Sequence, residues 1–303
     1  MMHAVDIVNI RTRDQASGAQ TPGSKLEGMQ AAEGSSRTQV IATMVLAAVF
    51  AGSIVFSLAG MALLRFSPSS AARVGALLPW LMKLPTWINM LSLPALVFVL
   101  YLPRFGWRRS TLLLVWGSFV GMMAELIGTG TGLPFGDYAY TSFLNPKIMG
   151  HVPYLIPLSW YAMSVISLDL ASRLRLTTAA RLAVAALFMV LWDVGLDPAM
   201  GAGFPIWTWN VEGFFYSMPA INWVGWFVTS LVIVWGYEAL AGVLFHARSR
   251  WTIPVWLVNG GFSIGICLVA GLGGAALAGT MALIIPVLAV RSPRAQPLET
   301  TAG

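Results

Sequence analysis

Long apolar segments separated by short polar ones dominate the chain after its first residues. Residues 1–37 are polar, rich in Gly, Ser, Gln and Thr, and show no sustained period, as is typical of a disordered tail. From Val40 onward there are eight apolar segments of about 20 residues, the length that an α-helix needs to cross the hydrocarbon core of a bilayer. They lie at about 40–64, 77–102, 110–130, 152–172, 179–198, 218–244, 252–270 and 274–290.

This pattern predicts an all-α fold, a polytopic membrane helical bundle with eight transmembrane helices. The last two segments are joined by Gly271-Leu272-Gly273-Gly274 and could instead form one helix, so seven spans are the alternative. The first segment is too long for the core of a signal peptide, which predicts an uncleaved first span. We therefore expect a disordered cytoplasmic tail over 1–37, a transmembrane helical domain over 38–292 and a short polar C-terminal tail over 293–303.

Basic residues support the eight-span arrangement, because cytoplasmic loops carry an excess of Lys and Arg. With the N-terminus inside, 14 basic residues fall in cytoplasmic segments and 4 outside, whereas seven spans give 12 and 6. The four outside are Arg65, Arg73, Lys83 and Lys147. We expect a multi-pass protein of the cell (plasma) membrane with both termini cytoplasmic.

Composition agrees with a membrane protein and excludes other classes. Of 303 residues, 57% are hydrophobic and 10% charged, against about 25% charged in soluble domains, and the mean hydropathy is +0.74. This excludes an ordinary soluble globule and a disordered protein. The net charge of +6 is scattered between apolar segments, so no nucleic-acid partner is expected. One cysteine, Cys267, excludes an intramolecular disulfide and a thiol metal cluster.

Seven acidic residues lie within the apolar body, where a carboxylate is costly and commonly functional. Asp169 and Glu238 fall near the cytoplasmic ends of their helices, and Arg173 follows Asp169 at i,i+4, which favours a structural role for this pair. The other five gather toward the opposite side, with Lys147 and His151 as neighbouring candidate partners. These five are Glu125, Asp137, Asp193, Asp197 and Glu212.

Asp193 and Asp197 form the most informative pair. Their i,i+4 spacing places both on one face of a helix, about 6 Å apart. Two such groups in a dry site do not both ionise easily, so one stays protonated and can act as an acid beside a base. Alternatively, Asp197 faces water at the helix end before Pro198, leaving only Asp193 unusual.

Aromatic residues crowd the loops on the same side as the five acids. They follow the third and fifth predicted helices, in the stretches 134–140 and 207–216. Aromatic belts at a membrane interface are common, but aromatic faces also stabilise cations. The rings therefore form either an aromatic belt at the membrane interface or the wall of a binding pocket. Histidines at ligand spacing are lacking in the sequence, so we expect no histidine metal site.

Several motifs, in order, resemble the CruF-type carotenoid 1,2-hydratases and the related bisanhydrobacterioruberin hydratases, a family of membrane carotenoid biosynthesis proteins. The resemblance covers about residues 111–245, and one departure is Asn145, where the family pattern has Gly. The matching stretches are Pro134-Phe135-Gly136-Asp137-Tyr138 with Tyr140, Val152-Pro153, Ile156-Pro157-Leu158-Ser159-Trp160, Trp192-Asp193-Val194-Gly195-Leu196-Asp197-Pro198, Trp207-Thr208-Trp209, and Gly213-Phe214-Phe215-Tyr216 with Pro219, Asn222, Gly225-Trp226 and Thr229.

The resemblance implies addition of water across the terminal C1–C2 double bond of an acyclic carotenoid end, giving a tertiary alcohol without a cofactor or metal. Protonation of such an alkene gives a tertiary carbocation, which requires an acid, a base that orients water and a dry aromatic pocket. We expect Asp193 or Asp197 to donate the proton and its partner, or Asp137 or Glu212, to activate water, with Glu125 as a further catalytic candidate. The expected substrate-binding residues are Trp192, Trp160, Tyr138, Tyr140, Tyr216, Asn222, Lys147 and His151. The expected partners are an acyclic or monocyclic carotenoid, the lipid bilayer and downstream carotenoid-modifying enzymes.

Two other functions use the same acids. The Asp193–Asp197 spacing matches that by which membrane prenyltransferases hold magnesium and a diphosphate, but no Lys or Arg lies between Arg181 and Arg248 to bind the phosphates. A transporter or proton channel would use buried acids as a relay, and inverted repeats, which favour a transporter, are not visible.

Overall fold

The computed structural model describes residues 22–241 and 248–292. Its long helices are α1 (Pro22–Phe66), α3 (Leu78–Thr131), α4 (Ile156–Ser172), α5 (Thr178–Pro198), α6 (Ile221–Ala241), α7 (Thr252–Val269) and α8 (Gly273–Arg291). Shorter elements are α2 (Ser69–Val74), the 3-10 turns η1 (Gly75–Leu77) and η2 (Ser142–Leu144), the π-turn η3 (Ala199–Gly203), and the strands β1 (Tyr138–Tyr140), β2 (Lys147–Ile148), β3 (Val152–Pro153) and β4 (Trp207–Trp209).

The described residues are thus predominantly α-helical, as the sequence predicts. Six helical segments in them are long and apolar enough to cross a membrane, which indicates a multi-pass membrane protein. α4 is not among the six, since it has 17 residues. The predicted helix over 152–172 is shortened because Val152 and Pro153 form β3 and pair with β2. The six are Ser36–Phe66, Ala72–Thr131, Thr178–Gly203, Ile221–Leu240, Thr252–Val269 and Gly273–Arg291.

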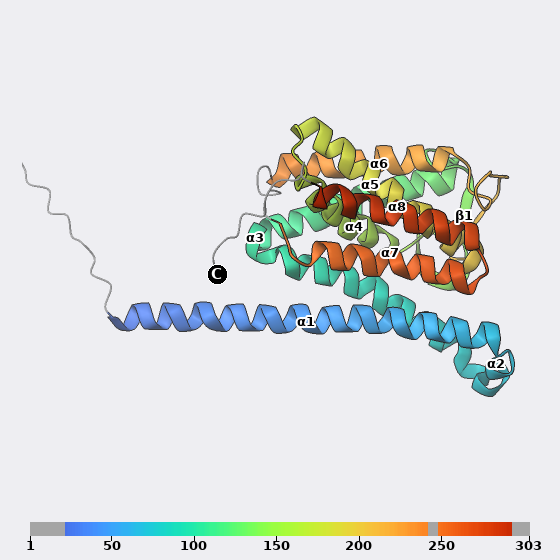
Figure 1. Cartoon of the computed structure of the whole chain (residues 1–303), viewed down its shortest axis with the longest axis horizontal. Coiled ribbons are helices and arrows are strands. Elements are labelled where there is room, and N and C mark those ends of the chain that lie inside the picture. Colours follow the sequence, from blue (N-terminus) through green and yellow to red (C-terminus); the bar gives the residue numbers. More distant parts are fainter. Residues whose placement is uncertain (1–21, 242–247, 293–303) are drawn as a thin grey trace, which may run out of the picture. The chain divides into compact units, whose positions relative to one another are not determined.

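α3 contains two of the predicted helices. Gly106 interrupts it with φ 70° and ψ 167°, a conformation that glycine adopts readily. Tyr101, before this kink, bonds to Asp169 near the C-terminal end of α4, whereas Glu125, after it, bonds to Trp160 near the N-terminal end of α4. Figure 1 shows the chain turning back at this kink, near the α3 label, so the two arms of α3 run antiparallel.

The two ends of the chain were expected to be polar tails. Residues 22–37, expected to be disordered, belong to α1, because Lys, Leu, Glu, Met, Gln and Ala in this stretch are good helix formers although the stretch is polar. Residues 1–21 and the C-terminal tail 293–303 lie outside the described residues. The chain divides into two compact units, Met1–Ile41 and Ala42–Gly303, and the fold described below is that of the second unit.

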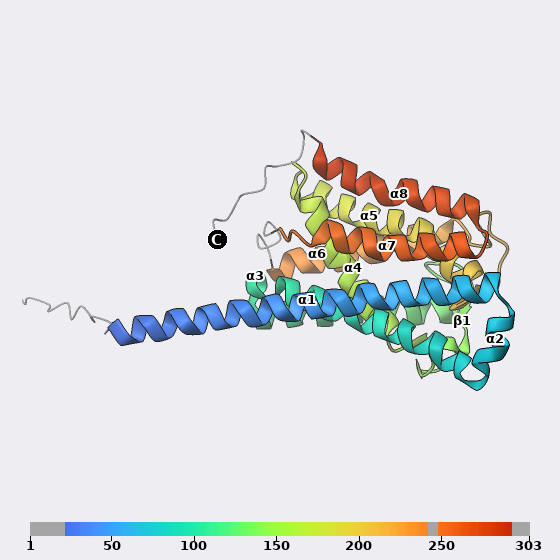
Figure 2. The same cartoon turned by 60° about the horizontal axis from the view of Figure 1, so that its bottom comes forward.

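The last two helices are separate. α7 ends at Val269 and α8 begins at Gly273, and Gly271 adopts a left-handed φ of 79° in the turn between them. The alternative of one long helix over both segments is therefore wrong. Figures 1 and 2 show α5, α7 and α8 side by side, and each packs against the other two.

α4 lies at the centre of the bundle. It packs against α3, α5, α6, α7 and α8, and nearly all of its side chains are buried. A helix that is apolar all round is expected to be enclosed by other helices. A buried polar cluster lies at each end of α4.

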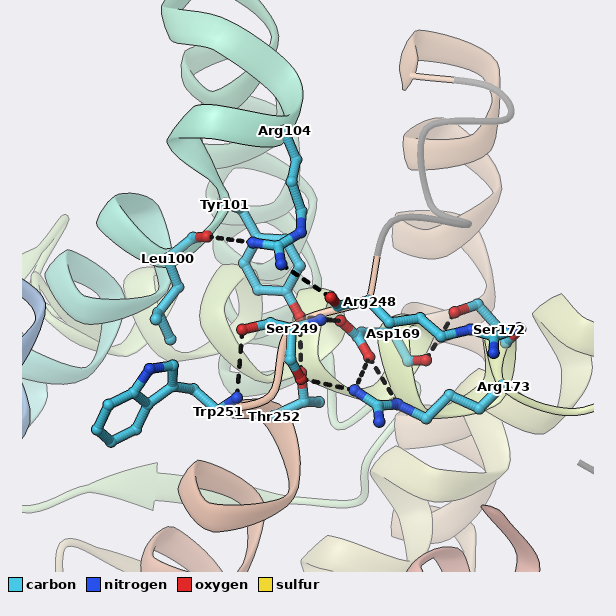
Figure 3. Close-up of polar contacts among 10 residues, drawn as sticks. All are labelled: Leu100, Tyr101, Arg104, Asp169, Ser172, Arg173, Arg248, Ser249, Trp251 and Thr252. Carbon is cyan, nitrogen blue, oxygen red and sulfur yellow. Dashed lines mark hydrogen bonds and ion pairs between the residues drawn. The ribbon is translucent and has the colours of Figure 1, made fainter. Parts of the chain in front are cut away.

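The cluster at the C-terminal end of α4 is built on Asp169 (Figure 3). Its Oδ1 accepts hydrogen bonds from Nε and Nη2 of Arg173 at 3.0 and 2.8 Å, and Oδ2 accepts from the backbone N–H of Ser249 at 3.0 Å. Oδ2 also accepts from the Tyr101 hydroxyl. The predicted ion pair between Asp169 and Arg173 is confirmed, and the cluster joins α3, α4 and the segment before α7.

Candidate active site

Two short strands form the cover of the cluster at the other end of α4. β1 and β4 pair antiparallel, with Tyr138 opposite Trp209 and Tyr140 opposite Trp207. Because side chains alternate along a strand, these four rings share one face, while Ala139 and Thr208 between them are exposed. The pair thus points two phenols and two indoles toward the helices.

Glu125, on the second arm of α3, is the acceptor beneath these rings. It is buried, and its Oε2 accepts hydrogen bonds from the hydroxyls of Tyr138 and Tyr140, the latter at 2.8 Å. Its Oε1 accepts from Nε1 of Trp160 at 3.0 Å. Three donors from β1 and α4 therefore hold one carboxyl group in a fixed orientation.

The phenols of Tyr138 and Tyr140 remain donors at neutral pH. Burial raises the pKa of both well above the usual tyrosine value, and the neighbouring Glu125 carboxylate raises both further. A raised pKa keeps the hydroxyl proton in place, so each phenol can bond to a carboxylate.

Asp193 and Asp197 lie together on α5 and share one partner. Nδ2 of Asn222, from α6, donates to Oδ2 of Asp193 at 3.0 Å and to Oδ2 of Asp197 at 3.1 Å. Nε1 of Trp209 donates to Oδ1 of Asp197 at 3.0 Å. Both acids are buried, so Asp197 does not face water at the helix end, the alternative that the sequence left open.

Oδ1 of Asp193 is an unusual atom in this cluster. It is buried without a hydrogen-bond partner among the parts of the chain that the structure describes. An unpartnered carboxylate oxygen in a dry place is costly, and protonation of the carboxyl group reduces this cost. The geometry therefore suits a carboxylic acid and a carboxylate joined by the Asn222 amide.

Glu125 and Asp197 face the same small cavity of about 50 Å³. A water molecule needs roughly 10–15 Å³ of cavity volume, so the carboxylate cavity has room for a few water molecules or for the end of a narrow molecule. We call it the carboxylate cavity; it is lined by Glu125, Phe135, Tyr138, Tyr140, Ile156, Ser159, Trp160, Leu196, Asp197, Trp207, Trp209, Asn222 and Trp226.

Stacked indoles form one wall of the carboxylate cavity. The ring centroids of Trp160 and Trp226 lie 4.3 Å apart in a stacked arrangement, and Trp192 meets Trp226 edge to face at 5.9 Å. Faces of indole rings attract cations, more strongly where water is excluded. The wall can therefore stabilise positive charge that develops near the carboxyl groups.

Other candidates from the sequence lie outside the carboxylate cavity. Asp137 and Glu212 are exposed, and Asp137 accepts a hydrogen bond from Nδ2 of Asn210 at 3.0 Å. His151 is exposed, and Lys147 donates to the backbone oxygen of Tyr140. The Tyr216 hydroxyl accepts from the backbone N–H of Ala275 at 2.9 Å. The structure does not bring these five side chains to Glu125, Asp193 and Asp197.

Four aromatic residues of the cavity were not among the candidates from the sequence, and one of them, Phe135, lies just before β1. Trp207 and Trp209 come from β4, and Trp226 from α6, one turn after Asn222. The alternation Tyr-Ala-Tyr and Trp-Thr-Trp is the signal that indicates two short strands, each with its rings on one face. Within 22–241 and 248–292, no group of three or more His, Cys, Asp or Glu is placed to hold a metal ion.

Comparison with known proteins gives two matches. A family model described as "Carotenoid biosynthesis protein" matches residues 86–286, a range that contains Glu125, Asp193, Asp197 and Asn222. The chain is also 31% identical over 192 residues to the bisanhydrobacterioruberin hydratase of Haloarcula japonica, covering 61% of this chain and 62% of that relative. The match thus spans less than two thirds of the relative's length. No solved structure matches the chain.

Proposed function

Since this chain belongs to the carotenoid biosynthesis protein family, we propose that it is a carotenoid hydratase. In this proposal it adds water across the terminal C1–C2 double bond of an acyclic carotenoid end group and yields a tertiary 1-hydroxy carotenoid. The observation that carries the proposal is the carboxylate cavity, in which Glu125 and Asp197 face one small space beside stacked indole rings. The distant relative named as a hydratase supports the same reaction.

The reaction begins with proton transfer to carbon. In the reactive form, the one proton of the Asp193–Asp197 pair lies on Asp197, which lines the cavity. Asp197 donates this proton to C2, a new C–H bond forms, and C1 becomes a tertiary cation. The indoles of Trp160 and Trp226 stabilise this cation through their faces. Asp193 is not part of the cavity lining, so it acts through Asn222, whose Nδ2 donates to both Asp193 and Asp197.

Water completes the reaction. An oxygen lone pair of a water molecule bonds to C1, and the Glu125 carboxylate accepts the proton that this oxygen releases. Return of that proton from Glu125 to Asp197 within the shared cavity restores both groups. The sum is the addition of one water molecule, and no redox cofactor is needed.

We also propose a specific arrangement in the membrane. Counting the two arms of α3 separately gives eight membrane spans, and both termini then lie on the cytoplasmic side of the cell membrane. The reversal at Gly106 supports this count, as does the excess of basic residues in the segments assigned to the cytoplasm. The carboxylate cavity then lies toward the outer side, and its substrate reaches it from the bilayer.

Pigment analysis tests the proposed reaction. The chain is expressed in cells that make lycopene or another acyclic carotenoid, and the extracted pigments are analysed by mass spectrometry. A gain of one or two waters supports a hydratase. A gain of an isoprenoid unit would instead indicate a prenyltransferase, and unchanged pigment would count against both enzymes.

A further inference from the structure

A second cavity, of about 320 Å³, lies beside the carboxylate cavity. Its volume falls within the roughly 300–1,000 Å³ of sites that bind small molecules. We call it the apolar cavity. Its walls come from α1, the start of α3, η3 and α7, and include Phe56, Gly60, Leu81, Met200, Ile206 and Phe262.

The lining of the apolar cavity indicates a hydrocarbon occupant. Among the described residues that line it, none is charged, and only Ser57 and Thr86 carry polar side chains. Thr86 already donates its hydroxyl proton to the backbone oxygen of Met82 at 3.0 Å. A lipid headgroup or a diphosphate requires polar or basic partners, so a purely apolar chain fits this space best.

The apolar cavity is accessible from the lipid-facing surface. Phe56, Leu63 and Leu81 line it and are also exposed on the outside of the described chain. A molecule dissolved in the bilayer can therefore enter between α1 and the first arm of α3 without crossing water.

A single turn of chain separates the two cavities. Ile206 lines the apolar cavity and Trp207, the next residue, lines the carboxylate cavity. Met200 lines the apolar cavity three residues after Asp197, and a Cβ atom on Gly201 would lie 3.5 Å from Oδ1 of Asp197. The turn η3 thus contacts the carboxyl group on one side and the apolar cavity on the other.

We propose that the apolar cavity binds the linear hydrocarbon chain of the carotenoid while its end group enters the carboxylate cavity past Met200 and Ile206. This inference rests on the proposed hydratase function. A cavity of about 50 Å³ accepts only the end of such a molecule, so the chain needs a separate apolar site. Met200 suits this position because its unbranched thioether adapts its shape to a neighbour.

Filling the apolar cavity from α1 tests the inference. Gly60 lines the apolar cavity and a Cβ atom on it meets nothing within 4 Å, so Gly60→Leu adds a side chain that begins in open space and takes up volume in the cavity. The variant is made in an Asp197→Asn background that does not turn the substrate over. Lycopene that co-purifies with the full-length protein from lycopene-producing cells is measured by absorbance per mole of protein.

We expect Gly60→Leu to retain about tenfold less lycopene than the background protein. Gly52→Leu is the matched control, because Gly52 is on the same helix, is exposed, also has nothing within 4 Å of its Cβ position and does not line the cavity. Ala59→Phe, which fills the cavity from the neighbouring position, should reproduce the loss and guards against a folding defect of one variant.

The outcomes separate this inference from the hydratase proposal. Equal lycopene retention by Gly60→Leu and Gly52→Leu overturns the inference. This holds also if Gly60→Leu is found to lose a bound phospholipid, because the cavity would then hold the phospholipid and not the carotenoid. Retention that depends on Gly60 supports the inference even if the wild-type chain adds no water to carotenoids, a result that would refute only the hydratase proposal.

Discussion

The Asn222 amide joins the two carboxyl groups of α5. Its Nδ2 lies within 3.1 Å of Oδ2 of both Asp193 and Asp197, and 3.0 Å from Sδ of Met218. An amide nitrogen has only two hydrogens, and the carboxyl oxygens are the stronger acceptors. Asn222 therefore sets the relative positions of the two acids and acts as a positioning residue.

Removal of this amide should abolish most of the activity. Asn222→Leu keeps a buried side chain of similar size but lets the two carboxyl groups separate, and we expect hydration to fall by about 10²–10³-fold, as for the loss of other preorganised donors. The measurement is hydroxylated carotenoid formed per mole of membrane-inserted protein.

Asn259→Leu is the matched control for that substitution. Asn259 is also buried, but its Nδ2 bonds to Sδ of Met163 and to neither acid. It should lose less than about tenfold, because a neutral hydrogen bond contributes only about 0.5–1.5 kcal/mol. Equal activity of the Asn222 and Asn259 variants would show that Asn222 does not position the two carboxyl groups for the reaction.

At the scale of elements, the sequence predicts one part of the site and misses another. The helical period of α5 places Asp193 and Asp197 on one face, as expected from their spacing. The pairing of β1 with β4 joins segments about 70 residues apart, and local propensity does not encode which short strands pair. The contacts of Tyr138 with Glu125 and of Trp209 with Asp197 depend on that pairing, so they could not be predicted.

The turn before β1 should be sensitive to a single methyl group. Gly136 has a φ of 111°, and a Cβ atom there would lie 2.6 Å from Cγ of Pro219 and 3.2 Å from Cζ3 of Trp209. Gly136→Ala should displace β1 and lower hydration by at least about tenfold, since overpacking costs about 1–3 kcal/mol. The pigment assay measures the loss.

Gly150→Ala separates this clash from backbone strain. Gly150 also has a positive φ, of 79°, but open space around its Cβ position. Its alanine variant should lose about 1–2 kcal/mol of stability from the backbone conformation alone and keep its activity. If both variants lose activity equally, the loss comes from the backbone conformation and not from the clash with Pro219 and Trp209.

The Asp169 cluster should affect stability and not chemistry. Asp169→Asn leaves Arg173 buried without its ion pair, which typically costs about 3–5 kcal/mol, and should lower the thermal midpoint in detergent. Activity per folded molecule should be unchanged, because the carboxylate cavity is at the other end of α4. Glu238→Gln is the comparison; the Glu238 side chain is 20% exposed and that of Asp169 is 1% exposed, so we expect a smaller loss of stability than for Asp169→Asn.

At the scale of the molecule, apolar segment length predicts most of the helices correctly. The eight segments correspond to α1, the two arms of α3, α4, α5, α6, α7 and α8. The two segments predicted over 77–102 and 110–130 agree with the two arms of α3, which the non-helical Gly106 divides. The helix over 22–37 was not predicted, because polarity and helix propensity are different properties.

The eight-span arrangement predicts opposite sides for two exposed positions. In a Cys267→Ala background, Trp107→Cys and Met149→Cys each provide one accessible thiol, since these residues are 67% and 82% exposed. A membrane-impermeant maleimide added to intact cells should label position 149, and position 107 only after permeabilisation. Labelling of both positions in intact cells would refute this arrangement of the two arms of α3.

The central claim is that buried carboxyl groups of this chain add water to a carotenoid. Its most direct test is pigment formation in lycopene-producing cells incubated with ¹⁸O-labelled water, comparing the wild-type chain with Asp193→Asn and Asp197→Asn. We predict that the wild type forms a tertiary alcohol whose oxygen comes from the labelled water, and that both variants reach the membrane but form none. Unlabelled product, or full activity of both variants, would contradict the account.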